Sequence, residues 1–144
     1  MKLLSAADTI VLSLHKNAWD MIDSGIKKHE FRRRFRREST LAFIYVTYPI
    51  KEIQGVILLD EPITGNAKKI AEIAESAIPG NGKSVYDYFI EKDFGLAIPI
   101  KEVRKIKPIS LDYLREKYNF TAPQFYLSLK NRAELYDELT RAII

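Results

Sequence analysis

The order of apolar and polar residues predicts short strands that alternate with helices. Val11–Leu14 indicates a strand, and Lys16–Ser24 indicates a helix that ends at Gly25. The almost continuous apolar run Leu41–Thr47 is typical of a buried strand. Because only a short turn separates it from the next apolar stretch, Glu52–Leu59, we expect these two strands to pair antiparallel.

The middle of the chain predicts a capped helix followed by further strands. Asn66 is suited to cap a helix over Ala67–Ala77, because its side-chain oxygen can accept from a free backbone N–H of the first turn. The segment Phe94–Lys107 predicts the next strand or strands. We expect an interruption around Pro99 and an end at Pro108, because proline cannot donate to a strand ladder.

The remaining elements are short. We expect helices over Ser84–Lys92 and Ser110–Tyr118, a last strand within Ala122–Leu127, and a final helix over Asn131–Ile144. No repeat or long linker divides the chain, so we expect one domain over 1–144. Several short strands with interspersed helices indicate a mixed α+β fold built on a small curled sheet or barrel.

Positive charge is concentrated in one segment, Gly25–Arg37, which holds seven Lys and Arg residues, one glutamate, and two interleaved phenylalanines. From His15 to Arg37 the net charge is +5, whereas the whole chain carries +4. The other residues therefore sum to −1. A local cluster of positive charge on a nearly neutral protein favours an anionic ligand such as nucleic acid.

The same segment alternates as a strand would. Lys27, His29, Phe31 and Arg33 share one face, and Lys28, Glu30, Arg32 and Arg34 share the other. Phe31 suggests that its own face meets the core. We therefore expect Glu30 and Arg32 to point away from the core, side by side.

Composition excludes several classes of site. The chain has no cysteine, which rules out disulfides and thiolate metal sites and fits a reducing, cytoplasmic location. Two histidines without a carboxylate cluster predict no metal, and we expect no cofactor. We expect His29 to be a hydrogen-bonded structural residue and His15 to cap locally. No apolar run reaches the ~18 residues of a membrane span, so we expect no membrane contact.

The pattern Gly25-x-Lys27-x-x-Glu30-x-Arg32, between a helix and a strand, resembles the signature of ASCH domains in the PUA-like superfamily. Other segments resemble that family in the same order, over roughly residues 9–128. They are Leu12–Lys16, Tyr45–Pro49, Ile53–Val56, Phe94–Ile98, Lys107–Leu111 and Ala122–Phe125. Residues 129–144 then form a C-terminal helical extension.

The resemblance implies a pseudo-barrel of five to six mostly antiparallel strands, flanked by helices, with a cleft beside it. It also implies binding to RNA or a nucleotide-like ligand, sometimes alongside transcription or translation machinery. Two activities are associated with branches of the family: amidohydrolysis of N4-acetylated cytidine, and ribonuclease action. Some members carry a helix-turn-helix domain and are described as predicted transcriptional regulators. In this chain the C-terminal helix, and not a helix-turn-helix domain, could contact a protein partner.

The resemblance and the charge pattern together select candidate site residues. The ligand- or RNA-binding candidates are Lys16, Lys27, Glu30, Arg32, Arg33, Arg34, Thr47, Tyr48 and Gln124. Tyr48 and Gln124 could stack on and hydrogen-bond a nucleobase. Lys27 and Glu30 are catalytic candidates only if the protein is an enzyme. The amidohydrolase branch has a threonine where Glu30 stands, and a carboxylate cannot replace that nucleophile directly.

Two alternatives remain open for these residues. Glu30 and Arg32 could be structural ion-pair partners instead of a site. The arginines from Arg33 to Arg37 could form a solvated loop instead of a phosphate-binding rim. For the whole protein we consider three hypotheses: an RNA-binding domain, a hydrolase acting on modified nucleosides or RNA, and a regulatory interaction module.

Overall fold

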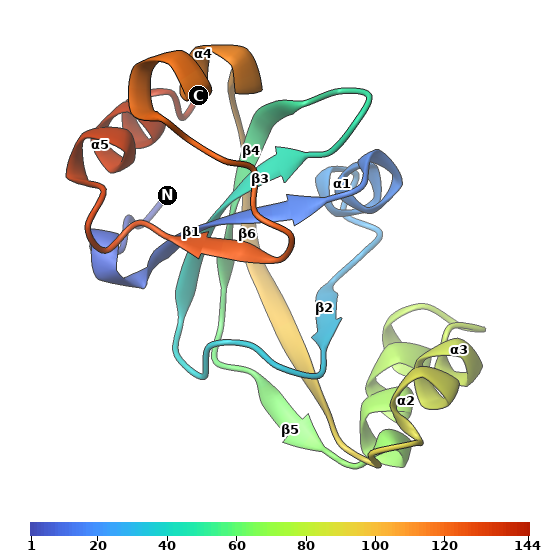
Figure 1. Cartoon of the computed structure of the whole chain (residues 1–144). Coiled ribbons are helices and arrows are strands. Elements are labelled where there is room, and N and C mark those ends of the chain that lie inside the picture. The colour runs from blue at the N-terminus through green and yellow to red at the C-terminus, as the bar shows by residue number, and fades with distance from the viewer.

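The computed structural model describes all residues from Met1 to Ile144 and has a mixed α+β architecture (Figure 1). The strands are β1 (Thr9–Leu14), β2 (His29–Arg32), β3 (Thr40–Val46), β4 (Glu52–Leu59), β5 (Ile63–Gly65), β6 (Gly95–Ser110) and β7 (Tyr126–Ser128). The helices are a 3-10 turn (Ala6–Asp8), α1 (Lys16–Asp23), α2 (Ala67–Ala77), α3 (Gly82–Phe89), α4 (Leu111–Tyr118) and α5 (Ala133–Arg141).

The strands form one curled sheet in the order β2-β6-β4-β3-β1-β7, with β5 also paired to β6. All neighbours are antiparallel except β1 and β3, which run parallel. Because both faces of β3 are covered, all seven of its residues are buried. The α+β prediction is confirmed, as is the antiparallel pairing of β3 with β4.

Two hydrophobic clusters lie on the two faces of the sheet. One contains Trp19 and Ile22 of α1 and the alternate residues of β1, β3 and β4. The other contains Leu111 and Leu114 of α4 and two leucines of α5. The Trp19 ring packs against Gly55, where an added Cβ would lie 2.1 Å from a ring carbon. A glycine is therefore required for helix α1 to approach the sheet this closely.

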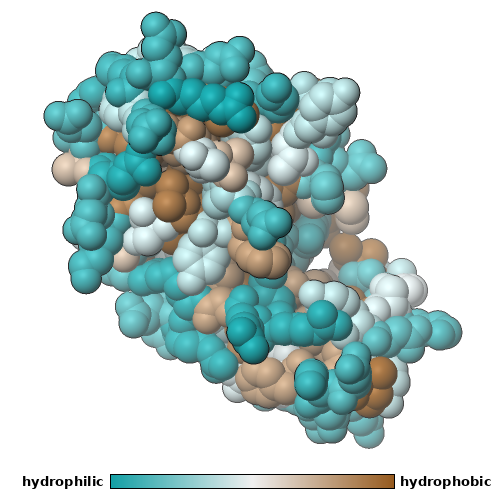
Figure 2. Space-filling view, in the orientation of Figure 1, coloured by the Kyte–Doolittle hydropathy of each residue, from teal (hydrophilic) through white to brown (hydrophobic).

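Helices α2 and α3 form a hairpin that stands apart from the rest (Figure 1). A third, smaller cluster, with Ile70 and Phe89 at its centre, joins the hairpin to the start of β6. Figure 2 shows this hairpin as a separate lobe with a notch between it and the main body. Asn66 caps α2 as predicted, because its side chain accepts from the Lys69 N–H at 2.9 Å. None of the helices is long and apolar enough to cross a membrane.

Strand β6 differs most from the prediction. It is one strand of 16 residues that continues through Pro99 and Pro108, so the expected interruption and end are both wrong. Its residues 95–99 pair with β2 and β5, and its residues 100–110 pair with β4. Both prolines adjoin register shifts in the β4–β6 pairing. A missing N–H is tolerated there because the ladder is already irregular.

Strand β2 is shorter than predicted and differently oriented. It ends at Arg32, and Glu30 is the one residue of the four that is buried. Phe31 lies opposite Ala97 and faces the α2–α3 hairpin, whereas Glu30 lies opposite Ile98 and faces the sheet core. The expectation that Glu30 points away from the core is therefore wrong, because the hairpin supplies a second apolar layer for Phe31.

Helix α5 belongs to the fold of the domain. Leu135 and Leu139, four residues apart, are buried in the core, but the helix ends at Arg141 and not at the expected Ile144. Ile143 forms an isolated bridge with Ile106 of β6 instead of a further helical turn. The element predicted as a strand over Ala122–Leu127 begins only at Tyr126.

A polar cluster fastens α5 to α4. One carboxylate oxygen of Glu138 accepts hydrogen bonds from the Tyr113 hydroxyl and the Lys117 ammonium, each at 2.9 Å, and from the Tyr118 hydroxyl. Burial alone would raise the pKa of Glu138, but these three donors outweigh it and lower the pKa to about 2. The ionised carboxylate therefore stabilises the docked helix.

We expect Glu138→Gln to lower the free energy of unfolding at neutral pH by about 1–2 kcal/mol, because an amide accepts weaker hydrogen bonds than a carboxylate. The folded-state pKa is lowered, so this stabilisation is complete above the ordinary value of 4.5 and disappears as the pH falls towards 2. Urea unfolding at several pH values measures the difference. Glu116→Gln, an exposed change on α4, is the control. A penalty that does not change with pH would contradict this account.

Candidate nucleic-acid interface

The structure brings Lys27, Glu30 and Arg32 together in what we name the Glu30 ion-pair cluster. The Glu30 side chain is only 5% exposed. Its Oε1 lies 2.7 Å from the Lys27 ammonium, and its Oε2 accepts from Nε and Nη2 of Arg32 at 3.2 and 3.1 Å. Each carboxylate oxygen is therefore already paired with a cation.

The position of the cluster follows from the local chain. Helix α1 ends at Asp23, and Gly25 adopts a positive φ of 81° that turns the chain towards β2. The Lys27 N–H then donates to the Met21 carbonyl at 2.9 Å, which holds the lysine beside the strand. A carboxylate placed in a core needs such compensating cations, because its desolvation is otherwise strongly unfavourable. The cluster thus fits the structural interpretation of these residues, with both cations at its solvent edge.

A cavity lies beside the basic segment, at the end of β2. We name it the arginine–aromatic cavity; it has a volume of about 660 Å³. Its lining residues are Arg32, Arg33, Arg34, Phe35, Tyr88, Phe125 and Tyr126. Three predicted arginines therefore meet aromatic rings from α3 and from the segment around the start of β7. In such an arrangement the cations can bind phosphate, and the aromatic rings can stack on bases.

The arginines around this cavity differ in how firmly the protein holds them. Arg33 donates from Nη2 to the Tyr88 carbonyl at 2.7 Å, and its guanidinium lies 4.0 Å from the centre of the Tyr88 ring. Arg34 is exposed and has no hydrogen bond, ion pair or aromatic contact within the protein. Of the arginines that line the cavity, Arg34 therefore has the charge most available to a ligand.

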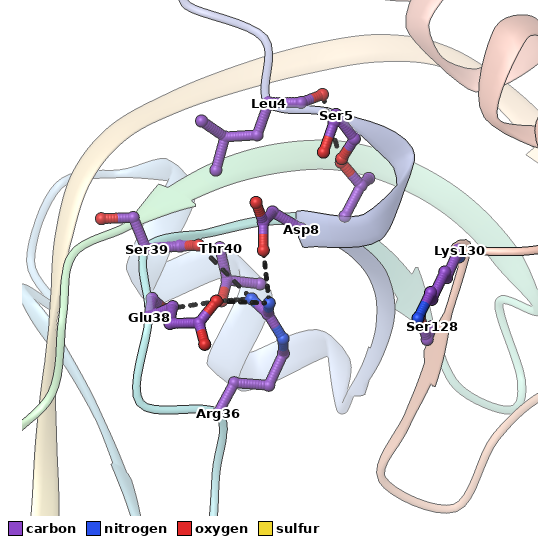
Figure 3. Close-up of polar contacts among 10 residues, drawn as sticks. Leu4, Ser5, Asp8, Arg36, Glu38, Ser39, Thr40, Ser128 and Lys130 are labelled. Atoms are coloured by element: carbon purple, nitrogen blue, oxygen red, sulfur yellow. Dashed lines mark hydrogen bonds and ion pairs between the residues drawn. The ribbon is translucent and has the colours of Figure 1, made fainter.

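Arg36 does not belong to this surface. Its guanidinium lies 2.6 Å from the Asp8 carboxylate and also donates to the Thr40 hydroxyl and the Ser39 carbonyl (Figure 3). Glu38 lies 3.5 Å away. These contacts fasten the loop between β2 and β3 to the N-terminal 3-10 turn. Arg36 is therefore a structural clamp and neither a free loop residue nor a phosphate ligand.

Other predicted residues lie outside the cluster and the cavity. Lys16 pairs with Asp20 at 3.0 Å on the exposed side of α1. The Thr47 hydroxyl lies 3.2 Å from Nδ1 of His15, which forms no cap with its side chain. Tyr48 is 82% exposed. The predicted cleft is thus distributed over several surfaces, and only its arginines line the arginine–aromatic cavity.

Gln124 adjoins the cavity without lining it. Its neighbours on both sides are fixed to β1: the Ser13 hydroxyl donates to the Pro123 carbonyl at 2.6 Å, and the Ser13 N–H donates to the Phe125 carbonyl at 3.1 Å. Gln124 itself is exposed. It is therefore next to the cavity-lining Phe125 along the chain, but it is not one of the residues that line the cavity.

A second cavity of about 380 Å³ lies on the opposite face of β2 from Glu30, between α1 and the α2–α3 hairpin. His29 and Phe31 line it, with Lys27 and Lys28 beside them. Burial lowers the pKa of His29, and its Nδ1 has no hydrogen-bond partner. The expectation of a hydrogen-bonded structural histidine is therefore wrong, although the ring does pack near Phe31 at 6.0 Å between centres.

The sequence reasoning missed Tyr88 and Phe125. Tyr88 lies on a helix 55 residues beyond Arg33, so no local pattern links the two. Phe125 is 68% exposed, which is unusual for a phenylalanine. The residues around it in the sequence do not predict this exposure. No group of three or more His, Cys, Asp or Glu side chains is placed to hold a metal ion.

Comparison with known proteins identifies relatives of the chain. No family model matches it. A protein of Zymomonas mobilis described as an ASCH domain-containing ribonuclease is 31% identical over 117 residues, which cover 79% of each chain. The crystal structure of ASCH from Zymomonas mobilis has a TM-score of 0.80 and 28% identity, and the match covers 96% of this chain and 97% of that one.

Two further solved structures are similar. A serine-to-alanine mutant of the Zymomonas mobilis protein has a TM-score of 0.80 and 26% identity, covering 98% of this chain and 100% of that one. The N-terminal domain of Staphylothermus marinus McrB has a TM-score of 0.58 and 12% identity, over 98% of this chain and 97% of that one. The second likeness concerns the fold alone.

We expect Glu30→Gln to lower the free energy of unfolding by about 3 kcal/mol, because it leaves two cations beside a neutral, buried amide. Asp20→Asn is the matched control, since it makes the same chemical change in an exposed pair and should cost less than about 1 kcal/mol. Urea unfolding measures both. Equal costs for the two variants would show that the Glu30 carboxylate is not a structural requirement.

Proposed function

The chain belongs to the ASCH domain family, and on that premise we propose that it binds RNA or a nucleotide-like ligand through the arginine–aromatic cavity and the turn after β2. The observation that carries the proposal is that Arg33 and Arg34 line one cavity with the exposed rings of Tyr88 and Phe125. Cationic and aromatic side chains on one surface are the groups that bind nucleic-acid backbones and unpaired bases.

The charge distribution supports the same proposal. The net +5 between His15 and Arg37 exceeds the net charge of the whole chain. Not all of this charge is free, because Arg32 and Arg36 are held in internal ion pairs. In this proposal the exposed part attracts phosphate, while Thr47, Tyr48 and Gln124 remain candidate base contacts at neighbouring positions.

A hydrolase is the second candidate, because a relative is described as a ribonuclease. In that case the reaction is cleavage of RNA or hydrolysis of a modified nucleoside, with Lys27 and Glu30 as the catalytic candidates. Lys27 could polarise a carbonyl or phosphoryl oxygen. Glu30 is a weaker candidate for a general base, because both of its oxygens are paired with cations.

Three narrower expectations belong with the proposal: a cytoplasmic location, a regulatory role in transcription or translation, and a protein partner at the C-terminal helix. The apolar side of α5 is already packed in the core, so a partner would meet its exposed polar residues, among them Glu134, Asp137 and Arg141. Cell fractionation and cross-linking of bound RNA and protein would test these three expectations. An interaction unaffected by charge reversal at these positions would exclude α5 as the contact.

Binding to short RNAs should weaken steeply with salt, because each neutralised phosphate releases condensed counterion. We expect Arg33→Ala/Arg34→Ala to weaken binding to most sequences about equally. The slope of log K against log salt should fall by about 0.7 for each phosphate that the variant no longer neutralises. Fluorescence anisotropy at several salt concentrations measures this slope. Lys107→Ala/Arg115→Ala removes the same charge elsewhere and should change little. Binding that is absent or independent of salt would refute the proposal.

The hydrolase alternative predicts turnover of short RNAs or acylated nucleosides, measured with and without divalent cations. Lys27→Ala should lower the rate by about 100-fold or more if Lys27 acts in the reaction. The variant also leaves Glu30 with one cation fewer, so its folding must be checked by circular dichroism. Lys27→Arg, which keeps the charge, is the control for that structural effect. Full activity in a folded Lys27→Ala variant would exclude this catalytic role.

A further inference from the structure

The cavity contains one cation that the protein leaves free. Arg32 is held by Glu30 through two hydrogen bonds to one oxygen, and Arg33 is held by the carbonyl and the ring of Tyr88. Arg34 has no internal partner and is exposed. A phosphate can therefore bind at Arg34 without breaking any contact of the folded protein, whereas at Arg33 it competes with Tyr88.

The cavity also contains one aromatic ring that is mainly in solvent. Tyr88 carries the Arg33 guanidinium on its face and packs edge-on against Phe89, with 4.7 Å between ring centres. Tyr126 packs against Phe35, with 5.4 Å between centres. Phe125 has no such aromatic or cation contact and is 68% exposed. Its ring is the most exposed of the aromatic rings that line the cavity.

The backbone beneath this ring is nonetheless fixed. Ser13 of β1 donates to the carbonyl of Phe125 from its N–H and to the carbonyl of Pro123 from its hydroxyl. The next residue, Tyr126, already pairs with Leu12 in the sheet. A fixed backbone under an exposed ring means that the main chain gives up little freedom when a ligand stacks on the ring.

Resting on the proposed function, we propose that the arginine–aromatic cavity is a one-nucleotide subsite, in which the base stacks on Phe125 and an adjoining phosphate is bound by Arg34. The cavity volume of about 660 Å³ lies within the ordinary range of small-ligand sites. Arg33 is bound to Tyr88 and forms the part of the cavity wall that lies between the main body and the α2–α3 hairpin. Because every base has a stacking face, the subsite accepts different bases.

The test separates base stacking from charge. Anisotropy is measured for a labelled RNA of about six nucleotides and for the same backbone with abasic residues. Phe125→Ala should weaken binding to the intact RNA about tenfold, the size of one base–aromatic stack, and leave binding to the abasic strand unchanged. Phe125→Trp should retain the affinity. Arg34→Gln should weaken both ligands and lower the salt slope by about 0.7.

Tyr86→Ala is the matched control, because Tyr86 is a partly exposed aromatic residue on the same helix as Tyr88 but does not line the cavity. Equal weakening of the intact and the abasic strand by Phe125→Ala would overturn the stacking subsite. No effect of Phe125→Ala, with salt-sensitive binding still abolished in Arg33→Ala/Arg34→Ala, would overturn the subsite and leave the proposed function standing. No binding of any RNA by the unchanged protein would overturn both.

Discussion

The buried carboxylate of Glu30 is the constraint on which the rest of the basic segment depends. It lies among the apolar residues of the sheet core and has a cation on each oxygen. Without these cations its desolvation would oppose folding by several kcal/mol. Lys27 must therefore stay beside the last turn of α1, and the Arg32 side chain must lie along β2. The residues that follow Arg32 then leave the sheet and turn into solvent.

This constraint divides the arginines of one short segment among different roles. Arg32 compensates Glu30, Arg36 fastens the following loop to Asp8, and Arg33 connects the main body to the α2–α3 hairpin. Of the three arginines that line the cavity, Arg34 alone has no internal partner. The net charge of the segment consequently overstates the charge available to a phosphate. A relative of this chain is described as a ribonuclease. In such proteins, the number of arginines in a segment does not identify the binding surface unless the internal partners of each arginine are known.

The predictions from sequence succeeded where an element is decided by its own residues. Helix α2 begins and ends as predicted, because Asn66 caps it and its alanines and isoleucines give it one apolar side. The family assignment is also confirmed, since a protein described as an ASCH domain-containing ribonuclease is 31% identical over 79% of this chain. The predictions failed at β2 and β6. There the outcome depended on a second apolar layer at β2, and on a change of pairing partner after Pro99 in β6.

The sequence by itself determined the class of fold, most of the elements, and the location of positive charge, because periodicity, caps and charge are local properties. Only the tertiary structure decided which face of β2 is buried, which arginines are free, and that Phe125 stands beside them. These depend on contacts between β2, α3 and β7, whose residues are far apart along the chain. An arginine in solvent and an arginine in an ion pair are the same letter in a sequence. The difference between them is set by what the fold places within about 3 Å of the guanidinium.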